Sequence, residues 1–201
     1  MAVAAGAAAL GLVGRMPSGP GVIEDAVIAE IAASVPPPVA TFLLTSETTA
    51  DAIIDHVRGC GTNTVQIVDA VEPDTYARIR AALPRLKIVQ VLHVANAAVI
   101  DDARRLAPSV DAFLLDSGDP TLQVKELGGT GRVHDWDLSR RLVAAVERPV
   151  FLAGGLRADN VARAIDTVRP FGLDLCSSVR SGGRLDPAKL TTFFAAVRSA
   201  A

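Results

Sequence analysis

Short apolar runs alternate with amphipathic stretches along almost the whole chain, and this alternation restricts the possible folds more than any other feature. The runs are rich in Val, Leu and Ile, as expected for strands of a buried parallel sheet. The predicted strands are 10–13, 39–44, 64–68, 86–92, 111–115, 150–153 and 171–176. The predicted helices are 23–34, 48–58, 73–83, 96–106, 135–146, 158–168 and 186–198. Strict alternation of this kind predicts an α/β fold with a parallel sheet.

An open doubly wound sheet and a closed barrel both fit this alternation, and the residues that follow the strands favour the barrel. Asp116, the pair Gly154–Gly155 and the pair Ser177–Ser178 each come shortly after a predicted strand. A barrel carries its active site at that end of its strands and commonly binds phosphate after the last two. We therefore expect residues 1–201 to form a single TIM-barrel-type domain.

Charge and cysteine content exclude several classes of partner. The formal net charge is -2 and no basic stripe is present, so we expect no nucleic-acid partner. Cys60 and Cys176 match no metal or redox spacing, which predicts no metal site and a reduced, cytoplasmic location. The Ala-rich stretch 2–9 is too short to span a bilayer and favours a helix, so no membrane partner is expected.

Several motifs occur in order along the chain and point to one family. They are Gly11–Val13 with Pro17–Pro20, Leu114–Ser117, Gly128–Gly131, Asp135–Trp136, Leu152–Leu156, Asn160–Val161, and Phe171–Asp174 leading into Ser177. At these residues the chain resembles phosphoribosylanthranilate isomerase. The resemblance implies an eight-stranded (β/α) barrel, here lacking the first strand, that performs an Amadori rearrangement in tryptophan biosynthesis. It also implies a phosphorylated sugar as substrate and no cofactor, and we expect a monomer or a homodimer.

The resemblance assigns the catalytic acid and the phosphate site to particular residues. Asp116 takes the place of the general acid that opens the sugar ring, although a strand-end Asp can also simply cap the next loop. Backbone amides around Gly154, Gly155, Ser177 and Ser178 are expected to bind phosphate. The alternative for both loops is a tight turn between a strand and a helix.

Three further positions are assigned to substrate contact. Gly129 and Gly131 lie in the long loop after Asp116, which either closes over the substrate as a lid or is a flexible surface loop. Asp174 either bonds substrate hydroxyls or anchors the barrel wall. We interpret His93 and His134 as structural, because no partner that would polarise them is evident.

The catalytic base has no counterpart in this sequence. In the family a cysteine on the first strand, in a Lys-Ile-Cys-Gly type motif, removes the proton, and nothing here matches that motif. Three explanations of the missing motif compete. The start codon is misassigned, another residue acts as the base, or the chain is a catalytically impaired or retasked phosphosugar-binding homologue. Cys176 is a candidate substitute base, although most buried cysteines are inert.

Three more positions depart from the family pattern. The family's Arg that contacts the substrate carboxylate appears here as Gly21, so Arg15 or Arg157 would have to replace it. Arg180 stands where the family has an acid, and it is either a phosphate contact or a surface residue. Asp69, at the end of another strand, is either a second carboxyl in the mouth or the start of a loop.

Overall fold

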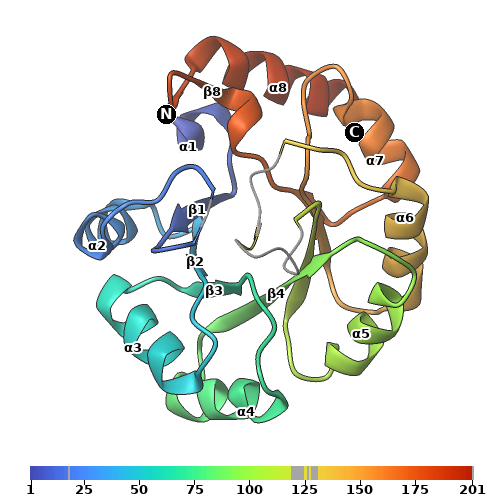
Figure 1. Cartoon of the computed structure of the whole chain (residues 1–201). Helices are drawn as coiled ribbons and strands as arrows, with labels where there is room; N and C mark the ends of the chain where they lie inside the picture. Colours follow the sequence, from blue (N-terminus) through green and yellow to red (C-terminus); the bar gives the residue numbers. More distant parts are fainter. Residues whose placement is uncertain (18, 119–124, 126, 128–130, 201) are drawn as a thin grey trace.

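A parallel sheet of seven strands, curled on itself, forms the centre of the molecule in the computed structural model (Figure 1). The structure describes residues 1–17, 19–118, 125, 127 and 131–200. Strand order follows chain order from β1 to β7, and every pairing is parallel. The strands are β1 (Ala9–Val13), β2 (Ala40–Thr45), β3 (Thr64–Ile67), β4 (Lys87–His93), β5 (Ala112–Asp116), β6 (Val150–Leu152) and β7 (Gly172–Leu173).

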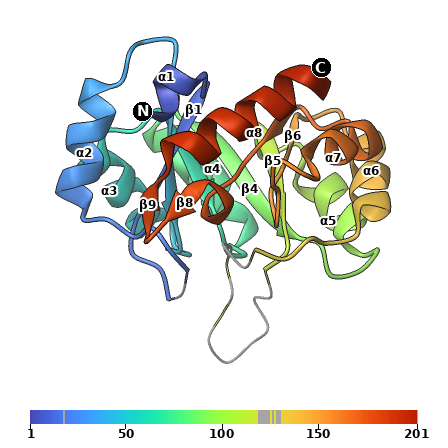
Figure 2. The same ribbon diagram turned by 90° about the horizontal axis from the view of Figure 1, so that it is seen from above.

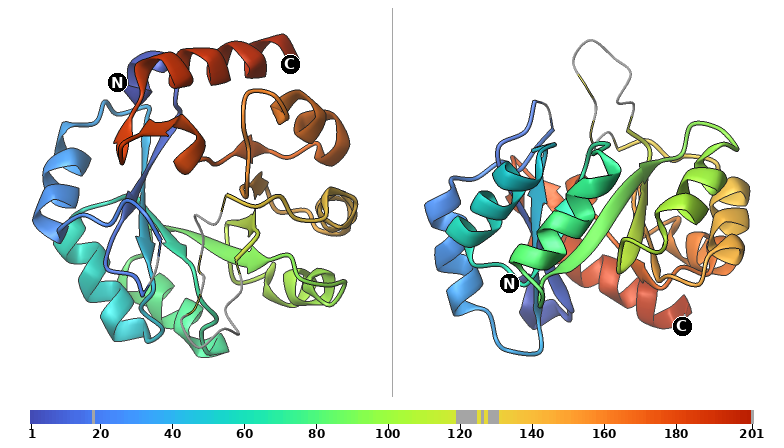
Figure 3. Two further views of the ribbon diagram at one scale, coloured as in Figure 1. Left: turned by 45° about the horizontal axis from the view of Figure 1, so that its top comes forward. Right: turned by 90° about the horizontal axis from the view of Figure 1, so that it is seen from below.

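Helices surround the sheet on its outer side, as the views in Figures 1 and 2 show. They are α1 (Ala2–Ala5), α2 (Asp25–Ser34), α3 (Ala50–Cys60), α4 (Pro73–Ala82), α5 (Val99–Leu106), α6 (Trp136–Ala145), α7 (Val161–Val168) and α8 (Pro187–Ala200). The short α1 lies beside α8, which Figure 3 shows from a second direction. None of the described helices is both long and apolar enough to cross a bilayer.

The strands bury both of their faces, which is why their sequences read as nearly continuous apolar runs. Ile88 and Leu92 of β4 pack outward against the helices, whereas Val89 and Val91 of the same strand pack inside the curled sheet. Phe42 and Phe151 extend the inner cluster, with their ring centroids 5.9 Å apart. This two-sided packing gives the sheet the architecture of a (β/α) barrel, as the sequence predicted.

The sheet is not closed by pairing of its first and last strands. Within the described residues, β1 pairs with β2 alone and β7 with β6 alone. The ring of Phe151 lies 5.4 Å from that of Phe171, just before β7, and Phe171 is 71% exposed. Within the described residues, this sheet of seven parallel strands matches the prediction of a barrel that lacks one strand.

Some boundaries differ from the predicted ones. The strand predicted over 171–176 is the short β7, followed by a 3-10 turn, η1 (Ser177–Val179). A small antiparallel hairpin of β8 (Arg180–Ser181) and β9 (Arg184–Leu185) then precedes α8, and the sequence did not predict it. Helix α3 begins at Ala50, two residues later than predicted. Its N-cap is therefore Thr49, whose hydroxyl accepts a hydrogen bond from Ala52 N.

Candidate active site

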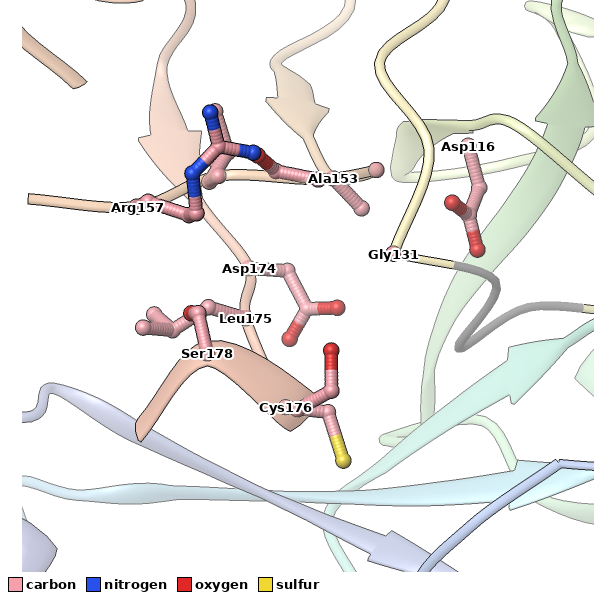
Figure 4. A pocket seen from close by; sticks show the side chains of 12 residues that line it. Asp116, Gly131, Ala153, Arg157, Asp174, Leu175, Cys176 and Ser178 are labelled. Carbon is pink, nitrogen blue, oxygen red and sulfur yellow. The ribbon is translucent and has the colours of Figure 1, made fainter. Parts of the chain in front are cut away.

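One cavity of about 170 Å³ lies where the loops after β5, β6 and β7 meet (Figure 4). Eight of the predicted site residues line it: Asp116, Gly131, Gly154, Gly155, Asp174, Cys176, Ser177 and Ser178. Gly129 lies outside the described residues. The carboxyl group and the two expected phosphate turns therefore share a single cavity.

Asp116 ends β5 opposite His93, its register partner in β4. Its Oδ1 atom accepts a bond of 2.7 Å from Ser117 N, and the Ser117 hydroxyl lies 3.4 Å away. Burial raises the pKa of this carboxyl, while the Ser117 amide and the nearby His93 oppose the rise. A carboxyl with a raised pKa retains its proton to higher pH, which is what a general acid requires.

Asp174 is a second carboxyl in the same cavity. It follows β7, and its backbone N–H donates to Leu152 O at 2.9 Å. Burial and, after it, the neighbouring Asp116 carboxylate raise the pKa of Asp174 to about 6, against the lowering effect of a bond from Leu175 N. Both side chains point into the same space in Figure 4, so the two carboxyls influence each other's titration.

Two glycines form the turn after β6, and a backbone segment lies directly against them. Gly154 has φ +80° and Gly155 has φ +62°, a region that side chains rarely occupy. A Cβ atom at Gly155 would lie 2.7 Å from the carbonyl carbon of Arg132 and 2.8 Å from Val133 N. Glycine is therefore needed to admit the loop that returns from β5, whether or not a phosphate approaches the same turn.

The turn after β7 presents one unpaired hydroxyl. Ser177 and Ser178 begin η1, and both line the cavity. Ser178 Oγ is buried without a hydrogen-bond partner among the described residues. A buried hydroxyl without a partner carries a desolvation cost that an oxyanion in the cavity would remove.

The thiol of Cys176 lines the cavity but is poorly suited to lose its proton. The pKa of Cys176 is raised, mainly by burial and further by the Asp174 carboxylate, while Arg180 opposes the rise. Arg180 itself does not line the cavity: its Nη1 donates to Gly183 O at 2.9 Å. Arg180 is half-buried and its Nε atom has no hydrogen-bond partner among the described residues, so its position matches neither expected role.

A pair of charges between two loops was not anticipated from the sequence. The ammonium of Lys125, in the loop after β5, pairs with the carboxylate of Asp69, which follows β3. Asp69 Oδ1 also accepts from Ala70 N at 2.8 Å. The Asp69 carboxylate thus contacts both the backbone of its own turn and the side chain of Lys125. A lone Lys in a glycine-rich loop gives no sequence signal for such a pair.

The two histidines near the cavity are held by neighbouring groups. His93 Nε2 donates to Val68 O at 3.1 Å. His134 Nε2 lies 2.8 Å from the hydroxyl of Ser139, which itself donates to a backbone carbonyl. Burial lowers the pKa of His134 to about 4, against the raising effect of Asp135, so this ring is neutral at pH 7. Both contacts fit the structural interpretation.

Comparison with known proteins agrees with this geometry. A family model described as N-(5'phosphoribosyl)anthranilate (PRA) isomerase matches residues 13–196. The N-(5'-phosphoribosyl)anthranilate isomerase of Haloferax volcanii is 40% identical over 199 residues, which cover 98% of this chain and 86% of that protein. The phosphoribosyl anthranilate isomerase of Thermotoga maritima has a TM-score of 0.80 at 27% identity, covering 98% of this chain and 91% of that one.

A further solved structure adds a bound molecule. It is a phosphoribosyl anthranilate isomerase in complex with reduced 1-(o-carboxyphenylamino)-1-deoxyribulose 5-phosphate. Its TM-score is 0.77 at 25% identity, and the match covers 98% of this chain and 91% of that one. With the family match over most of its length, this chain belongs to the N-(5'-phosphoribosyl)anthranilate isomerase family.

Proposed function

We propose that this chain catalyses the Amadori rearrangement of N-(5'-phosphoribosyl)anthranilate to 1-(o-carboxyphenylamino)-1-deoxyribulose 5-phosphate. The observation that carries the proposal is the single cavity in which Asp116 meets both turns expected to bind phosphate. Family membership supplies the reaction, and the relative bound to the reduced product supports a phosphorylated sugar as ligand.

The phosphate lies between the turns after β6 and β7. The turn Gly154–Gly155 supplies backbone amides without side chains in the way, and Ser178 supplies a hydroxyl that has no partner in the described structure. Arg157 also lines this cavity, two residues after Gly155. The Nε atom of Arg157 donates to Asp159 Oδ1 at 3.1 Å. From this position the guanidinium is better placed to contact the phosphate than to contact the anthranilate carboxylate, which lies at the other end of the substrate.

Asp116 donates the proton that opens the sugar ring. The ring oxygen needs a proton as its bond to the anomeric carbon breaks, and burial raises the pKa of Asp116, which favours its protonated form relative to an exposed aspartate. Asp116 then carries a negative charge in a cavity that already contains Asp174, and this repulsion favours return of the proton after each turnover.

Within the residues described, Asp174 is better suited than Cys176 to accept the proton from the sugar C2. With a pKa of about 6, Asp174 is mostly ionised at neutral pH. The pKa of Cys176 is raised by burial, so its thiol is protonated there. A carboxyl or a thiol must lose its proton before it can accept another, so we propose Asp174 as the base and retain Cys176 as the competing candidate.

Rescue of a tryptophan auxotroph that lacks this isomerase tests the activity, and purified variants test the roles. Asp116→Asn and Asp174→Asn should each lower kcat at least about a hundredfold, the usual scale of general acid–base contributions. Cys176→Ser should retain most activity. Asp166→Asn, an exposed acid on α7, is the matched control. Full activity of Asp116→Asn would contradict the assigned acid, and loss only in Cys176→Ser would reverse the choice of base.

A phosphosugar-binding protein without turnover is the second candidate, because the described residues contain no counterpart of the family's cysteine base. It predicts that the reduced product analogue raises the thermal midpoint while no rearrangement is detected. Sensitivity of that protection to Ser178→Ala would place the ligand in the proposed cavity. A single domain spanning the chain, a cytoplasmic location and a monomeric or homodimeric state remain part of the proposal.

A further inference from the structure

A second group of reactive side chains lies on the outer side of the sheet, between α2 and α3. Asp25 is the first residue of α2, and His56 and Cys60 are one helical turn apart on α3. One ligand atom from each of the three lies within 4.8 Å of the others. None of these residues lines the cavity described above, and the proposed reaction uses none of them.

The imidazole of His56 is held in a fixed orientation. Its Nε2 lies 3.1 Å from Asp25 Oδ1, and its Nδ1 lies 2.9 Å from the hydroxyl of the fully buried Thr45. The Thr45 hydroxyl also accepts a bond from Glu47 N at 3.2 Å. A partner on the second ring nitrogen is the arrangement by which proteins orient a histidine ligand toward a metal.

The chain makes room for this ring at one glycine. A Cβ atom at Gly14 would lie 2.6 Å from Cε1 of His56 and 2.8 Å from its Nε2. Any other residue at this position would therefore displace the imidazole from its place between Asp25 and Thr45. The cluster thus depends on β1, β2 and both helices, rather than on a chance meeting of surface side chains.

Cys60 places a sulfur ligand beside the carboxylate and the imidazole. The residue is fully buried, and its thiol would lose its proton on coordinating a divalent cation. One carboxylate and one thiolate then balance the two positive charges of the cation.

We propose that Asp25, His56 and Cys60 form a zinc-binding site that ties α2 to α3. Sulfur, nitrogen and oxygen ligands at about 2.0–2.3 Å are those of protein-bound zinc, and a tetrahedral site keeps its ligand atoms about 3–4 Å apart. The three side chains need to close by no more than about 1 Å to reach that spacing. Thiolate and imidazole select zinc over magnesium and calcium, and water completes the fourth position.

Zinc titration of the reduced, metal-free protein tests this site. We expect zinc to raise the thermal midpoint by about 5 °C or more once it exceeds the dissociation constant a hundredfold, with no comparable effect of magnesium. Asp25→Asn should weaken zinc binding at least about tenfold. Because Asp25 is exposed, this substitution leaves the fold intact. The matched control is Asp55→Asn, an exposed acid on α3 that is not a ligand.

Cobalt provides a readout that a merely stabilising contact would not give. Cobalt bound at this site should show thiolate-to-metal charge-transfer absorption, which Cys60→Ser abolishes and Cys176→Ser retains. Thr45→Val should weaken binding about 10–100-fold through loss of the bond that orients His56. Equal zinc affinity in Asp25→Asn and Asp55→Asn, or an absorption band that depends on Cys176, would overturn the proposal.

Discussion

Substitution of Gly155 by alanine should be more damaging than its position in a surface turn suggests. The φ of +62° makes any side chain strained there, which costs about 1–2 kcal/mol. The new Cβ atom would also lie 2.7–2.9 Å from three backbone atoms of Arg132 and Val133. Backbone moves less easily than a side chain, so we expect a further loss of about 1–3 kcal/mol, on the scale of overpacking.

A second glycine separates these two contributions. Gly61, the C-cap of α3, has φ +65°, but nothing lies within 4 Å of a Cβ atom placed there. Gly61→Ala therefore carries the strain of the dihedral angle without the clash. A smaller unfolded-state entropy offsets part of that strain, so Gly61→Ala should cost about 1 kcal/mol or less.

Urea unfolding of the two variants beside the parent protein measures the difference in free energy of unfolding. We expect Gly155→Ala to be less stable than Gly61→Ala by about 1–3 kcal/mol, and to bind the reduced product analogue more weakly, because the displaced segment lies against the turn proposed to bind phosphate. Equal losses in both variants would refute the argument that the loop after β5 packs closely on this turn.

Three further predictions concern buried polar groups. Tyr76→Phe should cost about 1–2 kcal/mol in urea unfolding, because the buried Gln90 Oε1 loses the bond it accepts from Tyr76 OH at 2.8 Å. Asp174→Asn should stabilise the protein by about 1–2 kcal/mol at pH 7.5 and not at pH 4, because its raised pKa makes ionisation above pH 6 unfavourable to the folded state. NMR titration should place the pKa of His134 near 4, and because this pKa is lowered, its contribution to stability should fade as pH falls from about 6.5 towards 4.

The sequence predicted the main elements because each is defined by a local pattern. The run 86–92 has apolar residues on both faces, and β4 occupies Lys87–His93. Pro73 begins α4 as predicted, since proline fits the first turn of a helix. The prediction for 171–176 failed at its end, because Leu175 and Cys176 have strand-forming character although the chain leaves the sheet after Asp174.

The site was predictable only where its residues follow strands directly. Asp116, Gly154 and Ser177 could be placed together because the ends of parallel strands meet at one edge of the sheet. Lys125 and Asp69 are 56 residues apart in the sequence, and no local pattern predicts their contact. The reason for glycine at 155 was also hidden, because the atoms that exclude a side chain are remote in sequence.

The residues of the cavity follow three consecutive strands, β5, β6 and β7. Their positions therefore do not depend on whether the first and last strands of the sheet pair with each other. The acid on β5 and the turns after β6 and β7 are held by pairings that continue without interruption from β4 to β7. The unpaired edges, β1 and the far side of β7, border the position where the resemblance places the thiol base. Because the proposed acid Asp116 and the proposed base Asp174 both lie in this cavity, phosphosugar binding and turnover should both withstand changes confined to those edges.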